Sequence, residues 1–342
     1  MHCNKRLLEA QMTRSDVQTF PIPRAAVWAG AALLSAALTA ACFERRSRRA
    51  ERNQPAAGRL LEIDGVRLHV VEKGEGPAVV LIHGNMVSER DFEASGLLDR
   101  LARNHRVIAF DRPGFGHSTR PRDRLWTPAA QAKLLHAALA QLGVTQAVVV
   151  GHSMGAMVAL ALALDYPEDV RRLVLLGGYY YPTARIDALL TAPVALPVLG
   201  DVMRYTVTAV SARLLLNRLV KAMFAPREVP VHFLPALSRE MMVRPIQLRA
   251  NAEDAAFMIP QAKASSERHQ GLRMPVAIVA GAEDKVIDVD AHSARLHREL
   301  AGSTLSVVAG SGHMVHHAAP DVVVAAVEGF ELPHLEPARQ AA

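Results

Sequence analysis

The stretch AVVV at 147–150, followed by GHSMG at 151–155, decides the fold of this chain. Four apolar residues are typical of a buried strand, and a helical pattern follows the pentapeptide. A G-x-S-x-G sequence between a strand and a helix predicts a tight turn that exposes the serine at the end of the strand. Glycines on both sides of the turn avoid the clashes that a Cβ would cause there. Ser153 is therefore the candidate nucleophile.

Short apolar runs repeat on either side of this turn. The runs are Ala78–Ile82, Val107–Phe110, Ala147–Val150, Leu173–Leu176, Val276–Ala280 and Leu305–Val308. Runs that are apolar on both faces are typical of strands buried in a parallel sheet, and helical patterns lie between them. An earlier alternating segment, 60–71, has Asp-Gly at its centre and predicts a hairpin. The sequence therefore predicts an α/β fold with a mainly parallel sheet.

The alternation of strands and helices is interrupted between residues 183 and 263. This segment has helical patterns and frequent prolines, and it contains no clear buried strand. We interpret it as a helical cap inserted into a core domain made of residues 59–182 and 264–333. The remaining residues, 334–342, are expected to form a short tail.

A serine hydroxyl is a weak nucleophile and needs a base that is oriented by an acid. Asp284 follows the first of the last two predicted strands, and His313 follows the second. Because the carboxyl ends of parallel strands meet at one edge of a sheet, both should lie near the serine. Glu283 is a rival for the acid, and His316 and His317 are rivals for the base.

Acyl transfer also needs hydrogen-bond donors for the developing oxyanion. The N–H of Met154, directly after the nucleophile, is one candidate. The second is the N–H of Asn85, because His83-Gly84-Asn85 follows an early strand at the same edge. His83 is expected to organise this loop from a buried position. The segment DRPGFGHS at 111–118 is expected to be a structural turn beside the site.

These motifs together resemble those of the α/β-hydrolase superfamily. The resemblance covers residues 59–333 and rests on LIHGN at 81–85, DRPGFGHS at 111–118, GHSMG at 151–155, GAEDKV at 281–286 and GSGH at 310–313. It implies an eight-stranded sheet flanked by helices, with a helical cap inserted after the sixth strand. It also implies the roles of nucleophile, acid and base for Ser153, Asp284 and His313.

Branches of the superfamily differ at the nucleophile. Haloalkane dehalogenases and epoxide hydrolases have aspartate where this chain has Ser153, and proline iminopeptidases usually show GGSWG. Carboxylesterases, lipases and C–C bond hydrolases all tolerate GHSMG, and cofactor-free perhydrolases share the triad. We therefore expect a serine hydrolase that cleaves a hydrophobic carboxylic ester through an acyl-enzyme. C–C bond hydrolysis or perhydrolysis by the same triad is an alternative, and a non-catalytic ligand-binding module is another.

The cap is rich in leucine, valine, phenylalanine and methionine, a composition that suits a hydrophobic substrate. Tyr179, Tyr180 and Phe257 are the candidate substrate-binding residues. No H-E-x-x-H or paired-cysteine pattern indicates a metal site, and no cofactor is expected. The two cysteines, Cys3 and Cys42, both precede the core domain, which excludes a disulfide framework inside it.

Residues 25–43 carry no charge and are long enough to span a bilayer. Arginines at 45, 46, 48, 49 and 52 come directly after this segment, and positive charge of this kind favours a cytoplasmic position for the C-terminal domain. We expect residues 1–24 to be a tail, 25–43 a single-pass anchor and 44–58 a basic linker to a cytoplasmic domain. A cleaved signal peptide, or a lipoprotein signal with Cys42 as the lipidated residue, would place the domain outside.

The net charge of +6 belongs to the N-terminal segment. Residues 1–58 contain nine basic and four acidic side chains, whereas the remainder contains 30 and 29. A nucleic-acid-binding domain needs a basic face, and this balance supplies no excess for one. The expected partners are a small hydrophobic ester and, through residues 25–43, a membrane. The sequence leaves the oligomeric state open.

Overall fold

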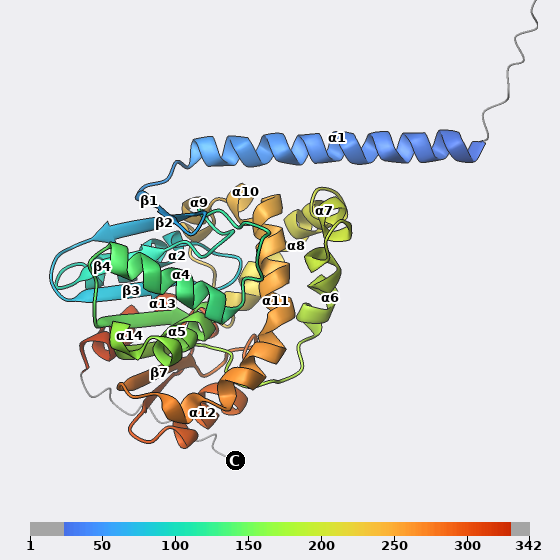
Figure 1. Ribbon diagram of the computed structural model, residues 1–342. Coiled ribbons are helices and arrows are strands. Elements are labelled where there is room, and N and C mark those ends of the chain that lie inside the picture. Colours follow the sequence, from blue (N-terminus) through green and yellow to red (C-terminus); the bar gives the residue numbers. More distant parts are fainter. Residues whose placement is uncertain (1–23, 330–342) are drawn as a thin grey trace, which may run out of the picture.

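A computed structural model of the chain describes residues 24–329, which form a sheet covered by helices on both faces (Figure 1). The sheet has eight strands in the order β1-β2-β4-β3-β5-β6-β7-β8. The strands are β1 Arg59–Ile63, β2 Val66–Lys73, β3 Ala78–Ile82, β4 Arg106–Phe110, β5 Ala147–His152, β6 Val170–Leu176, β7 Val276–Gly281 and β8 Thr304–Val308. The tail predicted at 334–342 lies outside the described residues, as does the tail predicted at 1–24 except for Arg24, the first residue of a helix.

Strands β3 to β8 pair in parallel, whereas β1 and β2 form an antiparallel hairpin and β2 pairs antiparallel with β4. The hairpin turn uses positive φ angles at Asp64 and Gly65, as an Asp-Gly turn requires. Strand β5, which carries the serine turn, lies between β3 and β6 and is buried along its whole length. The prediction of an eight-stranded, mainly parallel sheet flanked by helices is confirmed.

Helices α4, α5 and α12 cover one face of the sheet, and α2, α3 and α14 cover the other. Their bounds are α2 Arg90–Ala94, α3 Leu97–Leu101, α4 Pro128–Gln141, α5 Met154–Asp165, α12 Arg295–Glu299 and α14 Pro320–Glu328, and the short α13, Val315–Ala318, precedes α14. Thr127, the N-cap residue of α4, accepts a hydrogen bond from Ala130 N and precedes a proline in the first turn of the helix. The apolar side chains of the central strands thus pack in two layers, one against each group of helices.

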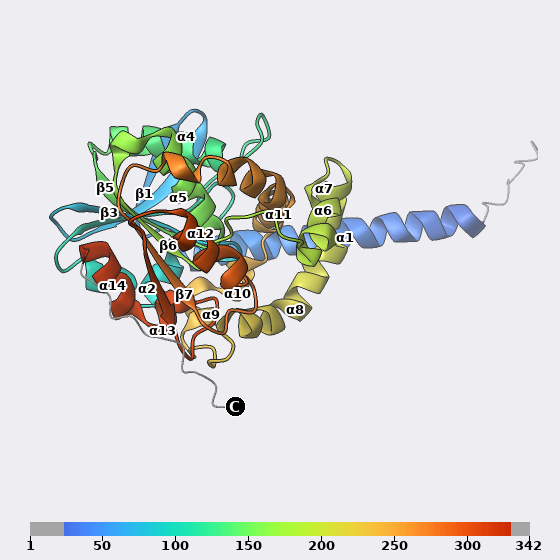
Figure 2. The same ribbon diagram turned by 90° about the horizontal axis from the view of Figure 1, so that it is seen from below.

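Six helices lie between β6 and β7, in the segment that the sequence assigns to the cap. They are α6 Ile186–Ala195, α7 Leu199–Met203, α8 Val207–Phe224, α9 Phe233–Leu237, α10 Arg239–Met242 and α11 Pro245–Ser266. Helix α11 runs across the edge of the sheet where the candidate residues lie, and α6 packs against it (Figure 2). Helix α11 ends three residues beyond the predicted boundary of the cap at residue 263.

Helix α1, Arg24–Asn53, is a single helix that reaches well beyond the predicted apolar segment. Residues 44–53, which the composition assigned to a linker, continue it because they are mostly good helix formers and include the Glu44–Arg48 pair at i,i+4. Its C-terminal half packs on the body through Phe43, Ser47 and Ala50. Its other half projects away from the body (Figures 1 and 2).

Candidate active site

Ser153 lies at the turn between β5 and α5 in a strained backbone conformation, with φ 54° and ψ −117°. A positive φ is uncommon for a residue with a side chain and indicates local strain. Two glycines make the turn possible. A Cβ on Gly151 would lie 2.5 Å from the carbonyl oxygen of Gly155, and a Cβ on Gly155 would overlap carbonyl oxygens at the end of β3. The G-x-S-x-G spacing therefore reflects close backbone packing around the serine.

His313 and Asp284 lie together at the same edge of the sheet. Nδ1 of His313 is 2.8 Å from Oδ2 of Asp284, and both side chains are almost completely buried. Burial alone would raise the pKa of the Asp284 carboxyl. The charge attraction and hydrogen bond of His313, with the N–H groups of Val286 and Ile287, outweigh burial and hold that pKa below its usual value. Asp284 is therefore an ionised acceptor that orients the imidazole.

Hydrogen bonds separate this pair from its sequence rivals. The Glu283 carboxylate accepts from Ser311 N at 3.0 Å, so it holds the backbone of the histidine loop. His316 and His317 both bond to the buried carboxylate of Asp91, at 2.9 and 2.8 Å. Asp284 is thus hydrogen-bonded to His313, whereas both rival histidines are hydrogen-bonded to Asp91.

His152 connects the nucleophile turn to the histidine loop. Its Nε2 is 3.0 Å from the carbonyl oxygen of His313, and the two rings are 4.9 Å apart. Burial, followed by the neighbouring His316 and His313, holds the pKa of His152 well below its usual value, so the ring is neutral and donates to that carbonyl. Because His152 directly precedes Ser153, this bond places the backbone of His313 beside the serine turn.

The loop His83-Gly84-Asn85 lies against the serine turn, on the side where the second oxyanion donor is expected. An added Cβ on Gly84 would be 3.1 Å from Cβ of Ser153. His83 is fully buried and bridges the loop, with Nδ1 2.7 Å from Gly84 O and Nε2 accepting from Arg112 N at 2.9 Å. Burial, and then the positive charge of Arg112, lower its pKa to about 4. His83 is therefore neutral.

Arg112 fixes this loop through hydrogen bonds. Its Nε donates to His83 O at 2.8 Å, and its Nη2 donates to Gly84 O at 3.0 Å and to the side chain of Asn85 at 2.7 Å. Three consecutive residues of the loop thus bond to one guanidinium group. Among the described residues, no protein acceptor is bonded to the N–H of Asn85.

A buried carboxylate from the cap neutralises this guanidinium group. Asp254 on α11 lies 2.5 Å from Nη1 of Arg112 and 2.9 Å from Nη2 of Arg120, and all three side chains are completely buried. Sequence reasoning assigned Arg112 only to a turn and did not identify Asp254. The available signal is a pair of adjacent acidic residues, Glu253 and Asp254, among alanines in a helix, and the first of them is partly exposed.

The cap covers the candidate site closely. The backbone of the chain leaving α8 lies on the histidine loop, since an added Cβ on Gly312 would overlap the carbonyl oxygen of Ala225. Tyr179 packs in one cluster with Met154, Met157 and Met258. This cluster joins the cap to the residue that follows the nucleophile.

The other two candidate substrate-binding residues lie elsewhere. Tyr180 packs in the main core of the sheet, and its hydroxyl accepts a hydrogen bond from Gly178 N at 3.2 Å. Phe257, on α11, is partly exposed. Only Tyr179 shares a packing cluster with a residue next to Ser153.

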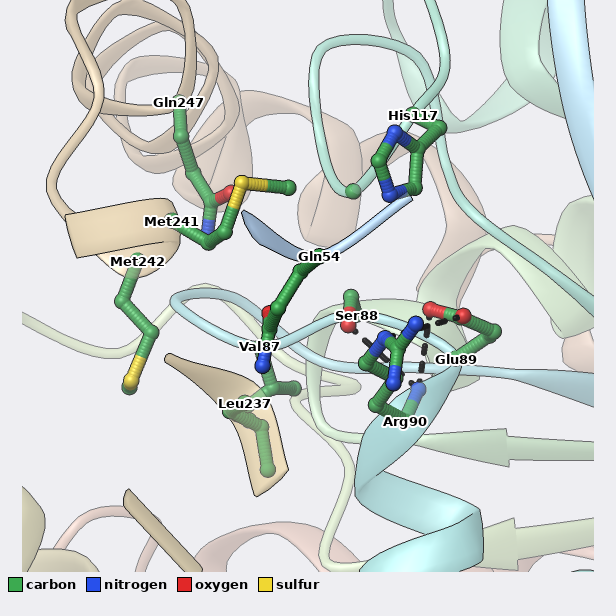
Figure 3. A pocket seen from close by; sticks show the side chains of 11 residues that line it. Gln54, Val87, Ser88, Glu89, Arg90, His117, Leu237, Met241, Met242 and Gln247 are labelled. Carbon is green, nitrogen blue, oxygen red and sulfur yellow. Dashed lines mark hydrogen bonds and ion pairs between the residues drawn. The ribbon is translucent and has the colours of Figure 1, made fainter. Parts of the chain in front are cut away.

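A surface pocket lies between the end of α1, the loop after β3 and the cap helices α9 and α10 (Figure 3). Gln54, Val87, Met241 and Gln247 are among its lining residues. None of the three candidate catalytic side chains lines it. We therefore assign the pocket to the junction of α1 with the cap.

Three groups of described residues have the ligand types and spacing for a metal ion: Asp91, His152 and His316; His69, Glu89 and Asp111; His136, Glu168 and Asp169. Each group contains a histidine–carboxylate hydrogen bond, at 2.9, 2.7 and 2.6 Å respectively. The aspartates in these groups thus have protein partners for their charge.

Comparison with known proteins agrees with this architecture. A family model described as the alpha/beta hydrolase fold matches residues 77–320. The chain is 30% identical over 282 residues to the 2-hydroxymuconate semialdehyde hydrolase of Pseudomonas putida, covering 79% of this chain and 92% of that protein.

Two solved structures are also similar. One is Cfl2 of Burkholderia cenocepacia, with a TM-score of 0.66, 26% identity and coverage of 79% of this chain and 94% of that one. The other is an esterase of Thermogutta terrifontis, with a TM-score of 0.63, 22% identity and coverage of 79% and 95%. From the sheet order, the strained serine turn and these matches we conclude that this chain belongs to the α/β-hydrolase family and is a hydrolase.

Proposed function

We propose that the chain is a serine hydrolase that cleaves hydrophobic carboxylic esters, with Ser153, His313 and Asp284 as its catalytic triad. The observation that carries this proposal is the buried His313–Asp284 pair beside a strained, glycine-flanked serine at one edge of the sheet. Strain at a turn is retained where the surrounding structure compensates for it, which is typical of functional sites.

The proposed reaction uses these three residues in turn. His313 takes the proton from the Ser153 hydroxyl through Nε2 while the serine oxygen bonds to the ester carbonyl carbon. Asp284 keeps Nδ1 of His313 protonated and stabilises the imidazolium that forms. The alcohol leaves with the proton from Nε2, and a water molecule then attacks the acyl-enzyme with His313 again acting as base. Release of the carboxylic acid restores Ser153.

The N–H groups of Asn85 and Met154 are proposed to hold the oxyanion. The Asn85 N–H has no protein acceptor among the described residues, and Arg112 fixes the carbonyl groups of the two residues before it. Donors that are fixed before the reaction stabilise developing charge without reorganisation.

An apolar substrate is proposed because apolar side chains surround the serine turn on the cap side. Met157, Met258 and Tyr179 pack with Met154 and are buried. Methionine side chains adapt to different shapes and suit a variable acyl group. We keep Tyr179 as the first candidate for substrate contact and Phe257 as a second, whereas the position of Tyr180 in the core gives it a packing role.

C–C bond hydrolysis with the same triad is the second candidate. The observation that favours it is the 30% identity to a 2-hydroxymuconate semialdehyde hydrolase over 92% of that protein. Attack on a ketone, either by a water molecule that His313 activates or by Ser153, would use the same base and the same oxyanion donors.

The test is labelling of the full-length chain in detergent with a fluorophosphonate probe, and then peptide mapping. A stoichiometric adduct on Ser153, absent in Ser153→Ala, is expected. A folded protein without an adduct would contradict an activated nucleophile and favour a ligand-binding module. Turnover of p-nitrophenyl esters compared with turnover of dienone ring-cleavage products then separates the ester reaction from C–C hydrolysis.

We also propose that residues 25–43 of α1 anchor the enzyme in a membrane, with the catalytic domain in the cytoplasm. Helix α1 is long and apolar enough to cross a bilayer, and only 6% of its apolar window is buried, unlike a core helix. The five arginines after residue 43 favour a cytoplasmic position for the domain. Protease treatment of intact spheroplasts should leave the domain uncut, and cleavage from outside would contradict this topology.

A further inference from the structure

The exposed apolar side chains of this molecule are concentrated in two places. Among the described residues, 18 large hydrophobic side chains are exposed, of which five lie on α1 and ten lie between Leu190 and Leu219 in the cap. We call six of these cap residues, carried by α7, α8 and the chain before them, the cap tip: Leu196, Val198, Leu199, Val202, Val207 and Leu214. Exposed apolar side chains concentrated in one part of the chain are typical of an interaction site.

Charges near the cap tip are paired. Asp201 bonds to Arg122 and lies 2.9 Å from Arg204. Arg213 lies 2.7 Å from Glu240, and its guanidinium covers the ring of Phe43 at 4.2 Å. From Leu190 to Leu214 the carboxylate and guanidinium groups therefore have partners of opposite charge or an aromatic face. Pairing lowers the free-energy cost of bringing these charged groups close to a bilayer, compared with unpaired charges.

Helix α1 lies beside the cap and points past it. Both views show α7 next to the middle of α1, with the N-terminal part of α1 extending beyond the body on the side of α6, α7 and α8 (Figures 1 and 2). Arg213 of α8 contacts Phe43, and Glu51 is 2.6 Å from Arg244 at the start of α11. Gln54 donates to Ala236 O at 3.0 Å. These contacts fix the direction of α1 relative to the cap.

The depth of the cap along α1 can be estimated from burial. Ala36, Thr39 and Ala40 are partly buried and Phe43 is buried, all on one face of α1, whereas residues 24–35 are exposed. The interval from 36 to 43 corresponds to about 10 Å at 1.5 Å per residue. The apolar segment 25–43 spans about 28 Å, close to the thickness of a bilayer core. If that segment crosses the bilayer, the cap beside residues 36–43 cannot remain in water.

From this geometry we infer that the cap tip inserts into the near leaflet of the bilayer that α1 crosses. This inference rests on the proposed membrane span. The partner is the acyl-chain region of a phospholipid bilayer, and the depth of about 10 Å is that of interfacial apolar segments. Arg45, Arg48 and Arg49, exposed on α1 just after the apolar segment, then lie at the level of the lipid phosphates. The apolar cap over Ser153 is thereby placed where hydrophobic esters dissolve.

The experiment places nitroxide labels on the full-length chain reconstituted in phospholipid vesicles. In a Cys3→Ser, Cys42→Ala background, single cysteines replace Leu199 in the cap tip, Leu34 on α1 and Val231 in the loop between α8 and α9. All three native side chains are exposed, so the labels should not disturb packing. Collision rates with oxygen, which concentrates in the bilayer, are compared with those of a water-soluble nickel chelate.

We expect the Leu199 and Leu34 labels to collide preferentially with oxygen and the Val231 label with the nickel chelate. An oxygen preference at Leu34 together with nickel accessibility at Leu199 would overturn the insertion of the cap tip and leave the span intact. Nickel accessibility at Leu34 would overturn the span itself and the inference with it. As a matched check, adding Leu199→Asp to a Val202→Cys chain should shift that label toward nickel.

Discussion

Replacing Asp254 with alanine should destabilise the fold strongly, because this carboxylate lies between two buried guanidinium groups. It is 2.5 Å from Arg112 and 2.9 Å from Arg120, and none of the three side chains is exposed. Burial lowers the pKa of Arg112 even with the carboxylate present. Removing one partner of a buried ion pair costs about 3–5 kcal/mol. We expect a loss of that size in the free energy of unfolding for Asp254→Ala.

The assay is urea unfolding of the full-length chain in detergent, monitored by far-ultraviolet circular dichroism. The matched control is Asp201→Ala, which removes another cap aspartate paired with two arginines. Because Asp201 and Arg122 are partly exposed, that change should cost less than about 1 kcal/mol. Equal losses of unfolding free energy in the two variants would refute the idea that burial makes the ion pairs of Asp254 more stabilising than those of Asp201.

If the Asn85 N–H is the proposed oxyanion donor, the same network should also affect catalysis. Asp254→Asn keeps the shape of the side chain but removes the charge that holds Arg112 against the loop before Asn85. We expect kcat for an ester substrate to fall while KM changes little, since the oxyanion donor acts on the transition state. A rise in KM with unchanged kcat would instead assign Asp254 to the shape of the substrate site.

Three further changes test the buried histidine, the nucleophile turn and a helix cap. The pKa of His83 is about 4 in the fold and about 6.5 when unfolded, so the unfolded state binds more protons between these values. The contribution of His83 to stability should therefore fall by about 3 kcal/mol as the pH drops from 6.5 to 4, and His269 and His292, whose pKa values burial also lowers to about 4, add to the fall. Urea midpoints of His83→Gln should show a smaller fall over this range. Gly155→Ala should slow fluorophosphonate labelling of Ser153 about a hundredfold by displacing the turn, whereas Gly30→Ala, with open space around it, should not. Thr127→Ala should cost about 1 kcal/mol in urea unfolding, and Thr127→Ser should restore most of it.

Local patterns predicted the parts of the site that depend on the nearest neighbours in the chain. The strand before Ser153 and the glycines around it are visible in the sequence, and so is the order of Asp284 and His313. Ser153, Asp284 and His313 each follow the end of a strand, so the parallel sheet brings them to one edge. A sequence pattern is sufficient there because the parallel sheet brings the ends of these strands to the same edge.

The parts that the sequence did not predict depend on contacts between distant segments. Asp254 and Glu253 are adjacent and chemically alike, and only the packing of α11 decides which of them is buried. Tyr179 and Tyr180 are distinguished in the same way, because one packs with Met154 and the other packs in the core. The helix at residues 44–53 is a different case, because its helix formers are local and visible in the sequence, and the contacts of Ala50 and Glu51 add to them.

The contact between Gly312 and Ala225 bears on how the enzyme opens. The chain leaving α8 touches the loop that carries His313, with no room for even a methyl group between them. A movement that pulled this end of α8 away would also disturb the loop that carries the imidazole of the proposed triad. Any opening of the cap that preserves the proposed triad must therefore leave the contact between Ala225 and Gly312 in place.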